Sequence, residues 1–369
     1  MHNLKYGRVV ISCDKILLFY RYTHTGTVSK RWKRSYDIMI SVPNLYGGTL
    51  MLSNFFPDYS SEIVFIGLLF AFLATCVLIE LLKNVLPRDG GRAFAVNGAL
   101  SQGKPRGAGI VFILSFTVFS LLLVPVSREI IIYYIMIIAA MISGYLDDSS
   151  KSPWNEYKKA IIDFAIALVT ALTYVNFNGS TLKILCLNLS IDLPAWLFVI
   201  LAIVLIWVAI NVVNCTDGVD GLCGSLSIVT LLGFYAVLLI TNTANDIAQS
   251  ILVMISCILG YLWFNASPSR LLMGDAGSRA LGIFIAIVTL KTGAALLFIP
   301  LAIVFILDGG LGLVKVSLLR FLKIHILKNT RTPLHDHARK NKGWSDTQTV
   351  FRFMILQIVV VCVTIGLIL

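Results

Sequence analysis

The chain has 369 residues, of which 57% are hydrophobic and only 13% are charged, and its mean hydropathy is +0.86. This composition excludes an ordinary soluble domain and predicts an all-α polytopic membrane protein. The net charge of +11 is also typical of nucleic-acid-binding proteins, but in membrane proteins basic residues usually set the orientation and contact anionic headgroups. We therefore expect the lipid bilayer, and no nucleic acid, as a partner.

Residues 1–50 form a basic leader with eight Lys and Arg residues, including "KRWKR" at 30–34. The leader lacks the apolar core of a signal peptide, because Asp14 and Lys15 interrupt its apolar stretch. Two interpretations stay open: a disordered arm, or a segment outside the mature protein with translation starting at Met51. In either case residues 51–369 are predicted to form a single transmembrane domain.

Ten apolar stretches approach the length of roughly 17 to 25 residues that a transmembrane helix needs. They cover residues 63–82, 108–126, 130–146, 159–175, 194–213, 222–240, 247–264, 278–293, 294–319 and 350–369. The eighth stretch is short and almost continuous with the ninth. If all ten span, the links on one face hold 17 Lys and Arg residues and the links on the other hold 3. Basic links stay in the cytoplasm, so the first face is predicted to be cytoplasmic.

Four polar clusters lie at the ends of these stretches, and alternation of the links places all four on the predicted cytoplasmic face. Their acids, amides and histidines are Asp147 and Asp148; Asn211, Asn214, Asp217 and Asp220; Asp275; and His335, Asp336 and His337. A single acid at a helix end is commonly a cap or a surface group. The convergence of four such clusters on one face instead predicts a functional site.

The residue types of the clusters favour phosphate chemistry. Neighbouring carboxylates repel one another unless a cation lies among them, and oxygen-rich ligand sets favour Mg²⁺. Such an ion commonly bridges phosphate groups. Glycines in "DGVDG" and "GDAGS" permit close backbone approach to a nucleotide, although each motif alone is equally typical of a tight turn between helices.

Four motifs resemble the polyprenyl-phosphate N-acetylhexosamine-1-phosphate transferases: "GYLDD", "NVVNCTDGVDGL", "LLMGDAGSRALG" and "TPLHDHARKNKGW". The resemblance runs from about residue 60 to the C-terminus. It implies a bacterial plasma-membrane enzyme, with its active site on the cytoplasmic face, that transfers a phospho-sugar from a UDP-sugar to undecaprenyl phosphate and releases UMP. It also implies Mg²⁺ as cofactor and a homodimer as a possible assembly.

Two stretches favour the branch that transfers phospho-N-acetylmuramoyl-pentapeptide from UDP-MurNAc-pentapeptide and makes lipid I for peptidoglycan. They are "TPLHDHARKNKGW" and "GKPRGAGIVFI", residues 103–113. Both depart from the branch pattern: Asp336 replaces the middle of three histidines, and Lys104 and Arg106 stand where threonines are usual. The alternative is the same chemistry with UDP-N-acetylglucosamine or another UDP-N-acetylhexosamine.

The resemblance also assigns roles to single positions. Asp275 matches a Mg²⁺ ligand, with Asn214 as a possible second, and Asp147 and Asp148 match acids that deprotonate or position the lipid phosphate. Asp147, Asp148 and Asp275 are catalytic candidates. His335 and His337, from the loop that closes near the donor, are two more. The candidate substrate-binding residues are Lys104, Asn211, Asp217, Asp220, Gly221, Leu222, Asn265 and Leu272. Five of them, Asp220, Gly221, Leu222, Asn265 and Leu272, match positions that line the uridine pocket of the family.

Three further acids lie in or near apolar stretches. Asp308 lies inside the ninth stretch before two glycines, and it should face protein or water, either in a groove for the lipid tail or at a helix contact. Glu80 and Asp163 are expected at the membrane interface. A transporter is the main alternative from another functional class, but transport sites usually lie near the midplane between repeats, and no matching halves are seen.

Overall fold

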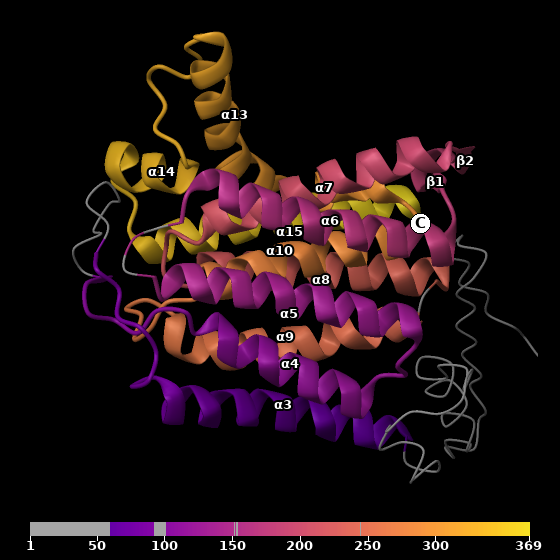
Figure 1. Ribbon diagram of the computed structural model, residues 1–369, viewed down its shortest axis with the longest axis horizontal. Helices are drawn as coiled ribbons and strands as arrows, with labels where there is room; N and C mark the ends of the chain where they lie inside the picture. The colour runs from indigo at the N-terminus through magenta and orange to yellow at the C-terminus, as the bar shows by residue number, and fades with distance from the viewer. Residues whose placement is uncertain (1–59, 92–100, 151, 153, 244) are drawn as a thin grey trace, which may run out of the picture. The chain divides into compact units, whose positions relative to one another are not determined.

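The computed structural model describes residues 60–91, 101–150, 152, 154–243 and 245–369 (Figure 1). The predicted leader, residues 1–50, and the alternative start at Met51 lie outside these residues. The described helices and strands belong to one unit, residues 46–368.

Almost all of the described secondary structure is helical. The long helices are α3 (Ser60–Leu82), α4 (Gly109–Leu123), α5 (Arg128–Asp148), α6 (Glu156–Asn178), α7 (Ala195–Thr216), α8 (Leu222–Thr241), α9 (Asn245–Asn265), α10 (Gly274–Lys291) and α15 (Asp346–Ile368). The short helical pieces between α10 and α15 are η4 (Ala295–Leu297), α11 (Phe298–Leu301), α12 (Ile303–Phe305), η5 (Ile306–Gly310), α13 (Leu311–Ser317), η6 (Leu318–Leu322) and α14 (Leu334–Lys342). An antiparallel hairpin joins β1 (Thr181–Ile184) to β2 (Leu189–Asp192) through η3 (Leu185–Leu187).

Seven of the described helices are long and apolar enough to cross a bilayer: α3, α5, α6, α7, α8, α9 and α15. Two further segments, Ala295–Leu301 and Ile303–Leu322, meet at 72° and make eight if they form one span. The predicted all-α polytopic membrane protein is confirmed, but the described residues contain seven or eight such spans instead of ten. The difference arises because α4 has only 15 residues and α10 contains Asp275, Arg279 and Lys291.

Helix α10 is surrounded by other helices and packs against α4, α5, α7 and α8. Every residue from 276 to 290 is buried. Glycines allow this close packing, since a Cβ on Gly282 would lie 2.5 Å from the Cα of Ile210, and a Cβ on Gly109 would lie 2.0 Å from the backbone nitrogen of Gly277. Protein rather than lipid therefore surrounds α10, which explains how a helix with several charges fits inside the bundle.

Asp163, which was expected at the membrane interface, is not exposed at the surface of the bundle. Its side chain is buried on α6 and forms an ion pair with Arg279 of α10, which is also buried. An unpaired charge inside a bundle costs several kcal/mol, so the two residues are found together. Glu80 is exposed on α3 and lies 3.5 Å from Arg270.

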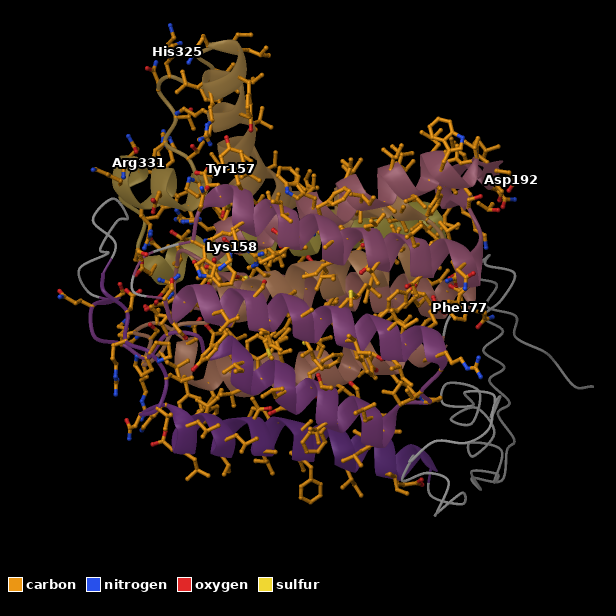
Figure 2. All side chains as sticks on the ribbon, in the orientation of Figure 1. Tyr157, Lys158, Phe177, Asp192, His325 and Arg331 are labelled. Atoms are coloured by element: carbon orange, nitrogen blue, oxygen red, sulfur yellow. The ribbon has the colours of Figure 1, made fainter. Side chains whose placement is uncertain are left out.

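The hairpin and the polar clusters lie at opposite ends of the bundle. Figure 2 places Tyr157 and Lys158, at the start of α6, and Arg331 near one end, and Phe177 and Asp192 at the other. Helix α5 ends, and α6 and α10 begin, at the first end. The polar residues that flank these helix ends converge there for this reason.

Candidate active site

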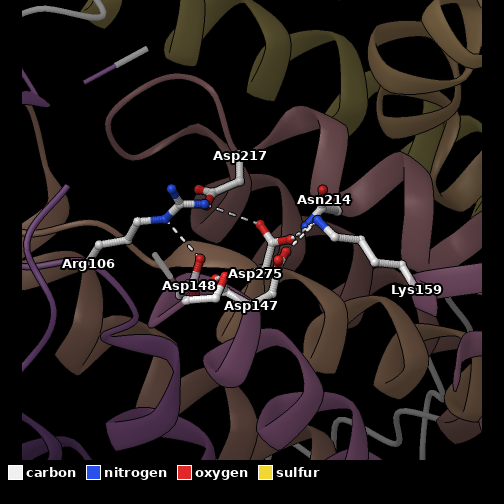
Figure 3. A pocket seen from close by; sticks show the side chains of 8 residues that line it. Arg106, Asp147, Asp148, Lys159, Asn214, Asp217 and Asp275 are labelled. Atoms are coloured by element: carbon white, nitrogen blue, oxygen red, sulfur yellow. Dashed lines mark hydrogen bonds and ion pairs between the residues drawn. The ribbon is translucent and has the colours of Figure 1, made fainter. Parts of the chain in front are cut away.

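A cavity of about 300 Å³ lies where α5, α6, α7 and α10 meet (Figure 3). Its lining consists of Arg106, Asp147, Asp148, Ser150, Lys159, Asn214, Asp217 and Asp275. Five of these residues come from three of the four clusters singled out in the sequence. Segments that are far apart in the chain therefore bring four carboxylates into one small space, which we call the acid cavity.

Asp148 is held by close packing of α5 on α10. Its Oδ2 accepts a hydrogen bond from the backbone N–H of Ala276 at 3.2 Å. Gly274 has φ +72°, and a Cβ there would lie 2.3 Å from the same oxygen. A Cβ on Gly144 of α5 would lie 2.3 Å from the carbonyl oxygen of Asp275. In "GDAGS" Gly274 therefore makes room for Asp148, beside the first turn of α10, where the helix dipole favours negative charge.

Asp147 is the last residue but one of α5, and its side chain contacts the segment that leads to α6. Its Oδ1 accepts a hydrogen bond from the backbone N–H of Trp154 at 2.8 Å. Its Oδ2 forms an ion pair with Lys159, whose Nζ also lies 3.4 Å from Oδ2 of Asp275. Lys159 thus connects two carboxylates that belong to different helices.

Arg106 is the second cation of the acid cavity. Its Nε lies 2.8 Å from Oδ1 of Asp148, its Nη2 lies 3.5 Å from Oδ1 of Asp275, and its Nη1 donates to Oδ1 of Asp89 at 3.4 Å. Burial tends to lower the pKa of Arg106, but the surrounding carboxylates outweigh this effect and hold the pKa above its usual value. The guanidinium is therefore charged at every accessible pH.

Asp275 contacts both cations. Burial tends to raise the pKa of its carboxyl, but Lys159, Arg106 and a hydrogen bond from Asn214 outweigh burial and hold the pKa below its usual value. The side chain of Asn214 also donates to Oγ of Ser278 at 2.9 Å. Asp275 is consequently a carboxylate at neutral pH.

The oxygen atoms of the acid cavity fit a divalent cation by their chemistry. No group of three or more His, Cys, Asp or Glu side chains within the described ranges is arranged to hold a metal ion. Magnesium does not require such a group, because it commonly takes one or two carboxylates, with phosphate oxygens and water completing its shell. Asp275 and the amide oxygen of Asn214 are suitable ligands of this kind.

A second group of predicted residues lies beside the acid cavity and includes Lys104. The Nζ of Lys104 donates to Oγ of Ser269 at 2.9 Å and lies 3.7 Å from Oδ2 of Asp220. The same carboxylate oxygen accepts from the backbone N–H of Ser269 at 2.9 Å. Leu222 is fully buried, and Leu272 donates its backbone N–H to the carbonyl of Pro105 at 2.8 Å.

Asn265 connects this second group to the turn before α8. Its Oδ1 accepts from the backbone N–H of Gly221 at 2.8 Å, and its Nδ2 donates to the carbonyl of Leu271 at 2.9 Å. Gly221 has φ +82°, a conformation that glycine adopts readily. The buried amide thus holds two loops together, whereas Asn211 donates to the carbonyl of Trp207 at 2.8 Å and does not line the acid cavity.

His335 lies outside the acid cavity, against the turn that carries Asp217. Asp308 accepts hydrogen bonds from the backbone N–H of His335 at 2.7 Å and lies 2.8 Å from its Nδ1. A Cβ on Gly218 would lie 2.3 Å from Nε2 of His335. Asp308 therefore faces protein, as expected, and it orients His335 toward the turn before α8.

The other two members of the "HDH" motif have separate partners. Asp336 accepts from Nη2 of Arg339 at 2.7 Å, and Nη1 of Arg339 donates to Asp346 at 3.0 Å. His337 accepts at Nδ1 from the backbone N–H of Arg331 at 3.3 Å. Asp336 is thus part of an ion-pair group that joins α14 to α15, and it helps to hold these two helices together.

Sequence reasoning missed Arg106 and Lys159 as members of the acid cavity. The only signal for Arg106 was its departure from the usual threonine. Lys159 was visible only as a basic residue twelve positions after Asp147. Neither signal identifies the carboxylates that these cations contact.

Comparison with known proteins identifies the family. The profile of Glycosyl transferase family 4 matches residues 130–293. Three relatives are each named phospho-N-acetylmuramoyl-pentapeptide-transferase. The one from Treponema pallidum (strain Nichols) is 36% identical over 351 residues, which are 90% of this chain and 96% of the relative. The one from Dictyoglomus thermophilum is 31% identical, over 70% of this chain and 82% of the relative. The one from Wolbachia sp. subsp. Drosophila simulans (strain wRi) is 28% identical, over 81% of this chain and 96% of the relative.

These relatives confirm the resemblance that four short motifs predict, and they extend it over nearly the whole chain. The chain belongs to the phospho-N-acetylmuramoyl-pentapeptide transferase family, within Glycosyl transferase family 4.

Proposed function

We propose that the protein transfers phospho-N-acetylmuramoyl-pentapeptide from UDP-MurNAc-pentapeptide to undecaprenyl phosphate, giving lipid I and UMP for peptidoglycan synthesis. Family membership supports a phospho-sugar transferase in a multi-pass membrane protein. The observation that carries the proposal is the acid cavity, in which four carboxylates, two cations and Asn214 meet at the ends of apolar helices. The family name of the relatives favours this donor over UDP-N-acetylglucosamine.

The position of the acid cavity suits an acceptor that is partly lipid. Asp147 and Asp148 are the last two residues of a helix that is apolar enough to cross a bilayer. A polyprenyl chain stays in hydrocarbon while its phosphate lies at headgroup depth, so the groups that contact the phosphate belong where a span ends. We assign this end of the bundle to the cytoplasmic side of the bacterial plasma membrane. The reason is that the links predicted on that side are rich in Lys and Arg, and some of these links line the acid cavity.

In the proposed reaction an oxygen of undecaprenyl phosphate attacks the donor phosphorus that carries the sugar. The bond from this phosphorus to the bridging oxygen breaks, and UMP leaves with that oxygen. The acids position the acceptor phosphate, while Lys159 and Arg106 offset the charge of the phosphates. One pyrophosphate linkage is exchanged for another, so the equilibrium is nearly balanced.

We assign Mg²⁺ to Asp275, with Asn214 as a second ligand. When bound, the ion supplies charge stabilisation to the phosphate oxygens. Asp275 is suited to this because its pKa is held below the usual value, so the carboxylate needs no deprotonation before it binds a cation.

The experiment that tests the proposed function measures UMP release by the purified chain in detergent, with undecaprenyl phosphate and Mg²⁺. UDP-MurNAc-pentapeptide and UDP-N-acetylglucosamine are offered in parallel. We expect release with the pentapeptide donor alone, and none in EDTA. Release only with UDP-N-acetylglucosamine would contradict the assigned donor, and release with neither would contradict the reaction.

A further inference from the structure

The segment that carries Lys104 and Arg106 is held in an extended form between two loops. The backbone N–H of Arg106 donates to Pro87 at 2.8 Å, that of Asp89 donates to Lys104 at 2.9 Å, and that of Leu272 donates to Pro105 at 2.8 Å. Side chains two residues apart in an extended chain point to the same side and are separated by roughly 7 Å at their bases. Lys104 and Arg106 therefore project together from a fixed backbone.

The two side chains reach two neighbouring places. Lys104 contacts Asp220 and Ser269, in the group predicted to bind the uridine part of the donor. Arg106 reaches Asp148 and Asp275 inside the acid cavity (Figure 3). A ligand that extends from the first place into the second passes both cations, and each of these side chains is 24% exposed and thus accessible.

The contact of Arg106 with Asp148 leaves hydrogen-bonding capacity unused. Nε and Oδ1 lie 2.8 Å apart, yet neither of these buried atoms has an aligned hydrogen-bond partner among the described residues. A guanidinium has five N–H donors in a planar fork that matches phosphate oxygens. Arg106 is therefore paired by charge but retains N–H groups that a phosphate can accept from.

We propose that Lys104 and Arg106 form a two-point cationic clamp for the diphosphate of the nucleotide donor, with Arg106 exchanging its contact with Asp148 for a contact with a phosphate oxygen. The clamp deepens the proposed function and rests on it. It explains how a dianionic diphosphate enters a cavity lined by four carboxylates, since two cations meet it along its path. Threonine at these positions, as the family pattern has it, supplies hydroxyl groups without charge.

The test compares binding of uridine, UMP and UDP to the purified full chain in detergent and EDTA, so that no metal ion mediates the contact. Calorimetry measures UDP and UMP, and competition against UDP measures uridine. We expect Arg106→Thr to weaken UDP binding by on the order of 10- to 100-fold, because a charge-assisted hydrogen bond is lost, and to leave uridine binding unchanged. Lys104→Thr should give the same pattern, and Arg106→Lys should retain part of the affinity.

The control is Arg128→Thr, which removes the same charge from the exposed first residue of α5, at the end away from Asp148. Equal loss of uridine and UDP binding in the Arg106 variant would overturn the clamp and make the residue structural. Unchanged UDP binding in Arg106→Thr and Lys104→Thr would also overturn it. If Arg106→Thr does not fold, Arg106→Lys and Lys104→Thr are used in its place. Unchanged UDP binding in both, or an equal loss of uridine and UDP binding, would overturn the clamp. A wild-type chain that binds none of the three ligands would contradict the proposed function itself.

Discussion

The carboxylates of the acid cavity differ in their contacts with the two cations. Asp147 pairs with Lys159 alone and Asp148 with Arg106, whereas Asp275 lies within 3.5 Å of both. Asp275 is thus the group on which the charge balance of the cavity depends most. Its removal leaves both cations with fewer partners and also removes the proposed metal ligand.

We expect Asp275→Ala to lower the rate of UMP release by at least about 10³-fold, since several kcal/mol of charge stabilisation is lost with the metal ligand. The measurement is the initial rate as a function of Mg²⁺ concentration, together with thermal unfolding of the detergent-solubilised chain. Asp192→Ala, on the exposed hairpin at the other end, is the control and should retain full activity. An Asp275→Ala protein that keeps the wild-type rate and Mg²⁺ response would refute the metal assignment.

At the residue scale the acids were predictable and their cations were not. Asp147, Asp148 and Asp275 stand at the ends of apolar stretches, and alternation of spans predicts that they share one face. The contacts of Arg106 and Lys159 depend on how two loops fold over the helix ends, which hydropathy does not encode. The departure at Arg106 was visible in the sequence, but its position among three carboxylates depends on contacts between segments that are far apart in the chain.

At the scale of elements, the site depends on how closely α5 packs against α10. Gly144 lies on α5 where any side chain would meet the backbone of Asp275. The separation of the two helices therefore sets the distance between the carboxylates at their ends. This makes helix packing a condition for the geometry of the acid cavity.

Gly144→Ala tests this dependence. The new Cβ would lie 2.3 Å from the carbonyl oxygen of Asp275, so the helices have to move apart by about 1 Å, and overpacking of this kind typically costs about 1 to 3 kcal/mol. We expect a lower unfolding temperature and a UMP release rate reduced on the order of 10²-fold, because misplacement by about 1 Å is enough for such a loss.

Gly366→Ala on α15 is the matched control for this variant. It is the same substitution in a helix, and no heavy atom lies within 4 Å of the added Cβ. Its stability should be unchanged or higher by up to about 1 kcal/mol, since alanine favours a helix over glycine. If both variants behave alike, the close approach of α5 and α10 does not determine the activity.

Hydropathy predicted helices at all ten stretches but could not tell which of them face lipid. Helix α10 is buried on all sides and carries charges at both ends, whereas α3 and α15 expose most of their apolar side chains. A buried helix and a lipid-facing helix have similar hydropathy, because the interior of a bundle and hydrocarbon are both apolar. The lower count of spans has the causes given above, the length of α4 and the charges of α10, together with the 72° break in the ninth stretch.

At the scale of the whole molecule, the orientation in the membrane follows from where basic residues and the acid cavity lie. The hairpin with Asp192 and the α6 start with Lys158 lie at opposite ends (Figure 2). The proposed topology puts the end that holds the start of α6 and the acid cavity in the cytoplasm, where a soluble nucleotide donor is available. It puts the hairpin outside. Exposed cysteines offer a direct way to determine this.

Cys186 lies in η3 of the hairpin and is exposed. In intact spheroplasts that express the chain, we expect a membrane-impermeant maleimide to label Cys186, because the hairpin faces outward in the proposed topology. In a Cys13→Ser background, which removes the cysteine that lies outside the described residues, Cys186→Ser should remove this labelling. In the chain with both substitutions, His325→Cys should react only after the membrane is permeabilised, because His325 follows η6 in the chain and Figure 2 shows it on the same side as Arg331. Two results together would invert the topology and place the acid cavity on the side that lacks the nucleotide donor. They are labelling of the His325→Cys thiol in intact spheroplasts, and labelling of Cys186 in the Cys13→Ser chain only after permeabilisation.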